Sequence, residues 1–224
     1  MLRLGRMPTD KTLNLWKKNL GTVPEEVWKH TETTVLILAD NGLTSLSASV
    51  GEMVNLRMLD LGHNRLDRLP EEIGRLVALG DFLYLHDNLL EALPASLAGL
   101  QRLKYLNFSE NRFTVFPEVV CRMSGLVELR ATDNRLSEVP TSIAALSQLR
   151  ELHLRNNSLR TLPDSIGTLA ELRQLDLRGN PIEELPDSLF HLPKLEKLDL
   201  RWVTTLREPA WLGALEARGC LVYK

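Results

Sequence analysis

Apolar residues return along this chain at a fixed spacing, and one asparagine returns with them. The asparagines follow short apolar segments such as LGHNRL and LRNNSL, at steps of 23 residues and, once, 24. They are Asn41, Asn64, Asn88, Asn111, Asn134, Asn157 and Asn180. Continuing the step of 23 in both directions reaches Lys18 and Val203, which makes nine units. A period of this length over most of a chain is typical of stacked structural modules.

Three further columns keep step with the asparagine. Six residues after it stands a proline in eight units, and Ser47 takes that place in the other one. Nine residues after it every residue is Val, Ile or Leu, from Val27 to Leu212. Five residues before it stands a leucine in all nine units: Leu13, Leu36, Leu59, Leu83, Leu106, Leu129, Leu152, Leu175 and Leu198. So many coincident columns exclude a chance alignment.

Each column predicts a local structure. The stretch Leu59-Asp60-Leu61 alternates apolar and polar residues, which is the period of a half-buried strand. The asparagine follows at the turn out of the strand, where its short amide can bond backbone groups, so stacked asparagines should form a ladder inside the coils. The proline presets φ for the first turn of a helical segment. Stacking then buries the apolar faces that one coil leaves open.

The repeated pattern L-x-x-L-x-L-x-x-N-x-L-x-x-L-P-x-x-I-x-x-L resembles the leucine-rich-repeat family. Its LP-x-x-I spacing is similar to that of bacterial members and of the Ras-group intracellular members of plants and animals. Nine units of 23 residues and one extra residue account for 208 of the 224 residues. The resemblance implies an α/β fold: a right-handed leucine-rich-repeat solenoid, curved like a horseshoe, with a parallel β-sheet on the concave face and short helical or 3₁₀ segments on the convex face. It also implies binding on the concave face, and it identifies no partner.

We expect a single domain over residues 1–224, with about nine coils between two caps. The ends of a solenoid must be covered if the protein is to stay in solution. The N-terminal cap is predicted over about residues 1–30 and the C-terminal cap over about residues 205–224. The N-terminal cap should be closed by Leu13, Leu15, Trp16, Leu20 and Trp28.

The far end of the chain also has the pattern of a cap. Residues 209–215 (PAWLGAL) predict a short helix, Gly219 is placed to end it, and residues 220–223 can add a final extended segment. Within the array, Ala131 takes a position that other units fill with Leu or Phe. That substitution predicts a locally thinner core or a larger neighbour.

The single step of 24 residues places one extra residue in the segment Leu79-Gly80-Asp81-Phe82, just before a predicted strand. Two interpretations are open. The residue can form a β-bulge that re-aims a neighbouring side chain, or it can be an insertion that the turn tolerates.

The residues beside the strand leucines point away from the core and form rows across the concave face. On the second to fifth coils these rows hold apolar and aromatic side chains: Val35, Ile37, Met58, Phe82, Tyr84 and Tyr105. Exposed aromatic clusters are typical of binding surfaces. The alternative is that these side chains only cover one another across neighbouring strands.

Charged residues on the same face are unevenly distributed. Acidic residues favour the N-terminal and central coils: Asp40, Asp60, Asp87, Glu110 and Asp133. Basic residues favour the C-terminal coils: Arg130, Arg155, Arg178, Lys197 and Arg201. Such a dipolar face would orient a partner. The predicted partner-binding residues are Met58, Phe82, Tyr84, His86, Tyr105, Asn107, Arg130, His153 and Arg155.

Composition narrows the class of partner. The formal net charge of −2 gives no surplus of Lys and Arg for nucleic acid. No apolar run near the start resembles a signal peptide, and none approaches the roughly 20 residues that span a bilayer. The two cysteines, Cys121 and Cys220, are far apart, which fits a reducing compartment. We expect a monomer in the cytoplasm, with secretion as an effector without a cleaved signal as the alternative.

Motifs for catalysis are missing from the sequence. It holds no phosphate-binding glycine loop, no G-x-S-x-G and no H-E-x-x-H. Cys121 and Cys220 are interpreted as core residues. His63 and His86 lie on adjacent coils near Asp87, but a metal needs a converging ligand set and supporting groups. We therefore predict no catalytic residue, no metal site and no cofactor.

The sequence thus predicts a protein–protein interaction module rather than an enzyme. Two alternatives stay open. Some bacterial leucine-rich-repeat effectors carry an additional ubiquitin-ligase domain, for which the predicted cap ending at Lys224 would leave no room. The similarity to Ras-group repeats also allows a regulator of a small GTPase or a phosphatase, which is an analogy of fold only.

Overall fold

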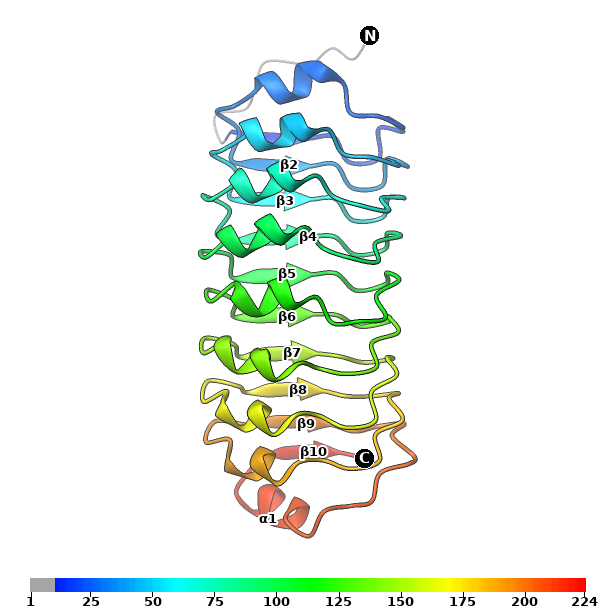
Figure 1. The fold of residues 1–224 in the computed structure, drawn as a ribbon, viewed down its shortest axis with the longest axis vertical. Coiled ribbons are helices and arrows are strands. Elements are labelled where there is room, and N and C mark those ends of the chain that lie inside the picture. Colours follow the sequence, from blue (N-terminus) through cyan, green and yellow to red (C-terminus); the bar gives the residue numbers. More distant parts are fainter. Residues whose placement is uncertain (1–10) are drawn as a thin grey trace.

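A computed structural model describes residues 11–224 of the chain, so the first ten residues of the predicted N-terminal cap lie outside the described part. Its strands form one parallel sheet in chain order. They are β1 (Thr12–Asn14), β2 (Val35–Ile37), β3 (Met58–Asp60), β4 (Phe82–Tyr84), β5 (Tyr105–Asn107), β6 (Glu128–Arg130), β7 (Glu151–His153), β8 (Gln174–Asp176), β9 (Lys197–Asp199) and β10 (Leu221–Tyr223). Figure 1 shows the coils stacked along one axis, and the solenoid predicted from the sequence is confirmed.

Each of the strands β1 to β9 has a buried leucine at its centre. Leu59 is fully buried, whereas Met58 and Asp60 on either side of it are half-buried on the concave face. The register pairs each central leucine with that of the next coil, as Leu59 pairs with Leu83. Because the alternation has period two, this register holds every flanking side chain on the same face.

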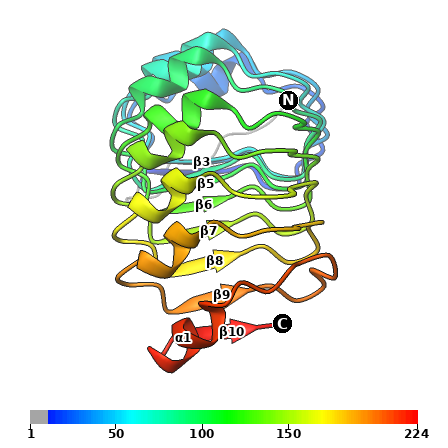
Figure 2. The same cartoon turned by 60° about the horizontal axis from the view of Figure 1, so that its bottom comes forward.

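The return legs are 3₁₀ helices, as the Leu-Pro pairs predict. They are η1 (Glu25–Lys29), η2 (Ala48–Glu52), η3 (Glu71–Arg75), η4 (Ala95–Gly99), η5 (Glu118–Arg122), η6 (Thr141–Ala145), η7 (Asp164–Thr168) and η8 (Asp187–His191). Pro70 precedes η3 with φ −71°, and its carbonyl accepts the first helical hydrogen bond from Ile73. Where Ser47 replaces the proline, its hydroxyl accepts a hydrogen bond from the N–H of Ser49 instead. Figures 1 and 2 show these segments in a layer opposite the strands.

The predicted asparagine ladder is present between the two layers. The amide nitrogen of Asn64 donates to the carbonyl oxygens of Leu61 at 2.9 Å and Leu38 at 3.1 Å, so it joins its own coil to the preceding one. Its amide oxygen accepts from the N–H groups of Asn41 and Leu43. The side chain thereby satisfies backbone groups that the turn leaves without partners inside the core.

The hydrophobic core is continuous from coil to coil, and it includes Ala131, the alanine at a position where the other units have Leu or Phe. In the preceding coil the same column holds Phe108, which is fully buried. The ring of Phe108 lies 4.9 Å from that of Phe113 and 6.3 Å from that of Phe116. Phe108 is thus a large buried side chain in the neighbouring coil, which is what one of the two expectations for Ala131 requires.

The N-terminal coil is closed as predicted, with one exception. Leu13, Leu15 and Trp28 are buried and Leu20 is half-buried. Trp16 is 55% exposed, so its placement in the cap core is wrong. Trp16 stands two residues before Lys18, which takes the position of the repeat asparagine in this coil. The side chains of that row leave the sheet toward the concave face.

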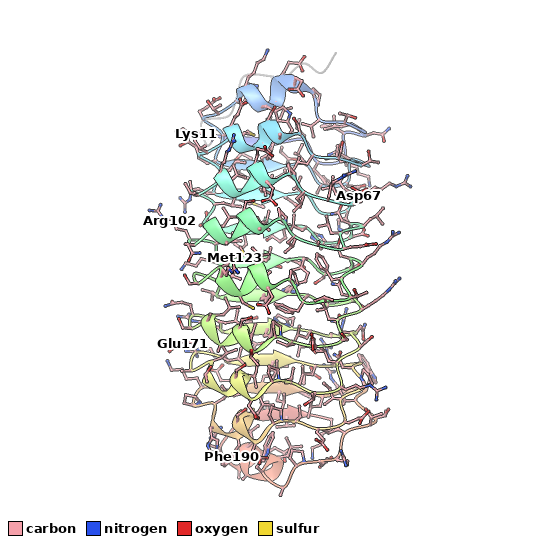
Figure 3. The ribbon with its side chains drawn as sticks, in the orientation of Figure 1. Lys11, Asp67, Arg102, Met123, Glu171 and Phe190 are labelled. Carbon is pink, nitrogen blue, oxygen red and sulfur yellow. The ribbon has the colours of Figure 1, made fainter. Side chains whose placement is uncertain are left out.

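The C-terminal segment forms the predicted helix and extended strand. The helix α1 (Leu212–Ala217) buries Leu212 and Leu215. Gly219 follows it with φ +97°, a left-handed conformation that glycine adopts without strain. β10 then adds to β9 in parallel. Of the labelled side chains in Figure 3, Phe190 lies at this end, and its ring packs 6.4 Å from that of Trp211.

The inserted residue falls in the turn between η3 and β4 and leaves the sheet unbroken. β3 and β4 pair without a shift, with Met58 opposite Phe82 and Asp60 opposite Tyr84. In the turn before β5, the N–H groups of Lys104 and Tyr105 donate to the carbonyl oxygens of Gly80 and Asp81. The backbone hydrogen bonds between the two coils therefore continue across the inserted residue. The tolerated insertion is therefore the correct interpretation, and the β-bulge is not formed.

Turns border the sheet on both sides of the stack. In Figure 3, Lys11, Arg102 and Glu171 lie along the edge where the chain enters the strands, and Asp67 lies along the opposite edge. None of the helices in residues 11–224 has the length and apolarity needed to cross a bilayer.

Candidate functional site

Three aromatic side chains of β4 and β5 meet on the concave face, and we call Phe82, Tyr84 and Tyr105 the aromatic patch. The ring of Tyr105 lies 5.5 Å from that of Phe82 and 5.1 Å from that of Tyr84. Phe82 and Tyr84 stack at 5.8 Å with an interplanar angle of 12°. These contacts stabilise the patch, yet Phe82 stays 40% exposed. Mutual cover therefore leaves apolar surface facing the solvent.

Two histidines extend the aromatic patch toward the turn out of the strands. The ring of His86 lies 6.0 Å from that of Tyr84 and 4.6 Å from that of His63. Nε2 of His86 and Nε2 of His63 are 3.2 Å apart, and Nδ1 of His63 lies 2.7 Å from the Asp87 carboxylate. The His86 ring covers Gly62, where a Cβ would overlap it. A glycine at this position therefore leaves room for the imidazole of His86.

Burial changes the acid–base properties of the aromatic patch. It raises the pKa of Tyr105 to about 12, although the Arg130 guanidinium opposes the shift. Burial also raises the pKa of Tyr84, and the nearby charge of Asp60 adds to the effect. Both phenols are therefore neutral at physiological pH and can donate a hydrogen bond to a bound molecule.

Next to the aromatic patch, the sheet face holds a polar hollow of about 330 Å³. Its lining includes Asn107, Arg130, His153, Arg155 and Arg178. Arg130 joins the two parts, because its guanidinium lies 5.8 Å from the Tyr105 ring while Nε donates to Glu128 at 2.6 Å. Arg155 bonds Asp133 at 2.8 Å, and its buried Nε has no partner. The hollow is thus lined by guanidinium groups that a bound acceptor could contact.

All nine predicted binding residues lie on this one face. Met58, on β3, is half-buried beside the aromatic patch, opposite Phe82 in the register. Asn107 holds its own strand end, since its side-chain oxygen accepts from the N–H of Ser109 at 3.0 Å. The structure brings the nine into one continuous area, and their contact with a partner stays a prediction.

The predicted charge gradient is weaker than the sequence indicates. Asp176 accepts two hydrogen bonds from Arg178, at 2.6 and 2.8 Å, and Asp199 accepts two from Arg201. Each aspartate ends its strand, and the arginine that pairs with it follows two residues later. The C-terminal coils therefore carry paired charges rather than a free positive surface.

A backbone requirement explains part of the acidic row. In all nine coils the residue just before the repeat-asparagine position has a left-handed backbone, with φ between +51° and +65°. These residues are Lys17, Asp40, His63, Asp87, Glu110, Asp133, Asn156, Gly179 and Trp202. Asp, Asn and Gly adopt this conformation most readily. Their recurrence at this position is thus a signal for a turn, which the sequence analysis took only as surface charge.

A second aromatic cluster on the sheet face was missed from the sequence. Trp202 is 66% exposed and Tyr223 is 42% exposed. The Arg201 guanidinium lies 5.9 Å from the first ring and 5.3 Å from the second. Tyr223 was assigned to the cap, and only the parallel pairing of β10 places it beside Lys197. The periodicity holds no signal for it, because β10 is not part of a repeat.

Acidification is expected to destabilise the sheet face at His86. Burial, together with the neighbouring His63, lowers the pKa of His86 below its ordinary value of 6.5. The folded chain binds this proton less tightly than the unfolded chain, so stability falls as the pH drops below 6.5. His86→Gln should flatten that part of the profile of unfolding free energy against pH, measured in urea from pH 5 to 8. An unchanged profile in the variant would contradict this assignment.

Comparisons with known proteins agree with the fold. The model of a family described as "Leucine-rich repeat region" matches residues 34–140 and 134–217. A leucine-rich-repeat protein of Leptospira interrogans is 27% identical, with a TM-score of 0.77 over 93% of this chain. The ectodomain of an Arabidopsis thaliana receptor kinase, GASSHO1/SCHENGEN3, solved in complex with CASPARIAN STRIP INTEGRITY FACTOR 2, is 28% identical, with a TM-score of 0.76 over 90% of this chain.

This chain is shorter than both of those proteins. It spans 65% of the length of the Leptospira protein and 25% of the length of the plant ectodomain. A search of curated protein sequences finds no match. Because the family model matches most of the sequence, and because every coil carries the buried leucine and all seven internal coils the asparagine of the ladder, the chain belongs to the leucine-rich-repeat family.

Proposed function

We propose that this protein binds a protein partner on its concave face, with the aromatic patch as the apolar anchor and the polar hollow beside it as the source of directional contacts. The observation that carries the proposal is the partly exposed, mutually packed cluster of Phe82, Tyr84 and Tyr105. Leucine-rich repeats commonly act as interaction modules. Their stability comes from the core leucines and the asparagine ladder, so the fold does not need aromatic side chains on this face.

Charge and hydrogen bonding support the same proposal. Arg130 lies between the aromatic patch and the hollow, where it can contact both an aromatic group and an acceptor of the partner. Arg, Tyr and aromatic anchors dominate the binding energy of protein interfaces. The plant receptor ectodomain, which has the same fold, was solved in complex with another molecule.

The double variant Tyr84→Ala with Tyr105→Ala is expected to weaken partner binding by about 30-fold or more. Two hot-spot aromatics each contribute about 2 kcal/mol or more, and such contributions are not strictly additive. The partner would be captured from the host through a photo-crosslinking residue at Phe82 and then titrated against purified wild type and variant.

The control removes exposed apolar surface elsewhere. Val77 and Val115 are 57% and 62% exposed and lie outside the strands, so Val77→Ala with Val115→Ala should bind as the wild type does. Circular dichroism and the urea midpoint would show that both variants fold. Retention of full affinity by the tyrosine variant would refute the proposal.

The two alternatives, substrate recognition for a larger ubiquitin-ligase effector and regulation of a small GTPase or phosphatase, rest on family resemblance. Both would still use this face for binding. No feature of residues 11–224 favours one of them over a general interaction module.

A further inference from the structure

Three ligand-type side chains converge on β6 and β7, and one of them, His153, lines the polar hollow. Glu128 and Glu151 are directly paired in the register, and His153 lies two residues beyond Glu151. One ligand atom from each can be chosen so that all lie within 4.8 Å of one another. Nε2 of His153 is 3.2 Å from the Glu151 carboxylate and 4.0 Å from that of Glu128. The side chains are 16–33% exposed, so solvent screens the group only in part.

A further carboxylate lies on the other side of the His153 imidazole. Its Nδ1 lies 4.0 Å from the carboxylate of Asp176, whose side chain is only 10% exposed. The carboxylate of Asp176 is fixed in place by two hydrogen bonds from the Arg178 guanidinium, at 2.6 and 2.8 Å. A carboxylate behind the far nitrogen orients a histidine whose near nitrogen binds a metal, and it makes that nitrogen more basic.

We propose that Glu128, Glu151 and His153 bind a divalent cation of the zinc class. Two carboxylate oxygens and one imidazole nitrogen suit Zn²⁺, whereas Mg²⁺ and Ca²⁺ take oxygen ligands. A bound cation would lie between Nε2 of His153 and the Glu151 carboxylate, in place of the direct contact between them. His153 also lines the hollow, which leaves room for a water molecule or a partner side chain as the fourth ligand.

Arg130 competes with the cation in this arrangement. Its Nε donates to Oε1 of Glu128 at 2.6 Å and neutralises that carboxylate when no cation is bound. Zinc binding must weaken this ion pair or use the other oxygen of Glu128. Removal of the guanidinium should therefore strengthen zinc binding, an effect that a purely structural role for the three residues does not predict.

The sequence analysis predicted no metal site, and it weighed only His63 and His86 as ligands. That pair is already hydrogen-bonded at 3.2 Å between the two Nε2 atoms, with Asp87 on one side. The convergence of Glu128 with residues 23 and 25 positions later depends on the register between β6 and β7, which places the first two side by side.

The test is a titration of the full chain with Zn²⁺ by calorimetry at neutral pH, with Co²⁺ absorption as a probe of nitrogen and oxygen ligation. We expect one bound ion per chain in the wild type. His153→Gln and Glu151→Gln should each lower the affinity at least about tenfold, since even loss of a supporting group costs 10–100-fold. Arg130→Gln should raise it.

His63→Gln is the matched control, because it removes an exposed imidazole from the same face and should leave zinc binding unchanged. The urea midpoint of each variant shows whether it folds. Equal zinc affinity in wild type and His153→Gln, loss of binding in His63→Gln, or no binding by the wild type would each overturn the proposal. The titration uses no partner, so its result is independent of the binding proposed above.

Discussion

Asn134→Ala is expected to lower the free energy of unfolding by about 3–5 kcal/mol. The Asn134 amide donates to the carbonyl oxygens of Phe108 and Thr132, each at 3.1 Å, and its oxygen accepts from the N–H of Phe113 at the same distance. Alanine leaves the buried N–H of Phe113 without a partner, at a cost of about 1–3 kcal/mol, and removes one of the two hydrogen bonds at each carbonyl oxygen, at about 0.5–1.5 kcal/mol for each. Equilibrium unfolding in urea measures the loss.

The matched control is Asn55→Ala. Asn55 is exposed, and its side chain makes one hydrogen bond, to the carbonyl oxygen of Thr31 at 2.9 Å. This variant should lie within about 0.5 kcal/mol of the wild type, as surface substitutions usually do. A broadened urea transition of the Asn134 variant would show that the two halves of the solenoid unfold separately, because coils contact only their neighbours. Equal midpoints for Asn134→Ala and the wild type would contradict a structural role for the ladder.

The coil geometry could be predicted from the sequence because each structural requirement recurs. One leucine, one asparagine and one proline per unit define a strand, a turn and a return leg, and nine repetitions remove ambiguity about register. The cap helix could also be predicted, since Gly219 has a local reason to end it. The exposure of Trp16 could not be predicted, because at the end of an array similar residues occupy the rows of the concave face and the core of the cap.

The candidate site was only partly predictable. The aromatic patch follows from strand alternation alone, since neighbouring units place Phe82 and Tyr105 side by side. The pairing of Arg178 with Asp176 depends on the rotamers of both side chains, above all of the long arginine, which a periodic pattern does not define. The group of Glu128, Glu151 and His153 likewise depends on side-chain direction as well as on register.

Phe108→Ala is expected to cost about 3–5 kcal/mol of unfolding free energy, the usual range for a buried phenylalanine. Phe108 is fully buried, and it fills the column where the next coil has only Ala131. The neighbouring alanine cannot expand into the cavity, and the rings of Phe113 and Phe116, in the same coil as Phe108, are themselves buried. The site therefore cannot collapse, which places the cost at the upper end of that range. Urea unfolding of the single variant gives the value.

A double-mutant cycle tests the reason for that cost. Ala131→Leu alone should destabilise the chain by about 1–3 kcal/mol, because it overfills the space beside Phe108. Combined with Phe108→Ala, the same leucine should recover stability, so the two changes should be non-additive by at least about 1 kcal/mol. Ala131→Leu with Leu177→Ala is the control, since Leu177 occupies the same column two coils away and is equally buried. If the Phe108 pair is as additive as the Leu177 pair, Phe108 does not fill the volume that Ala131 leaves, and the core tolerates the two residues for separate reasons.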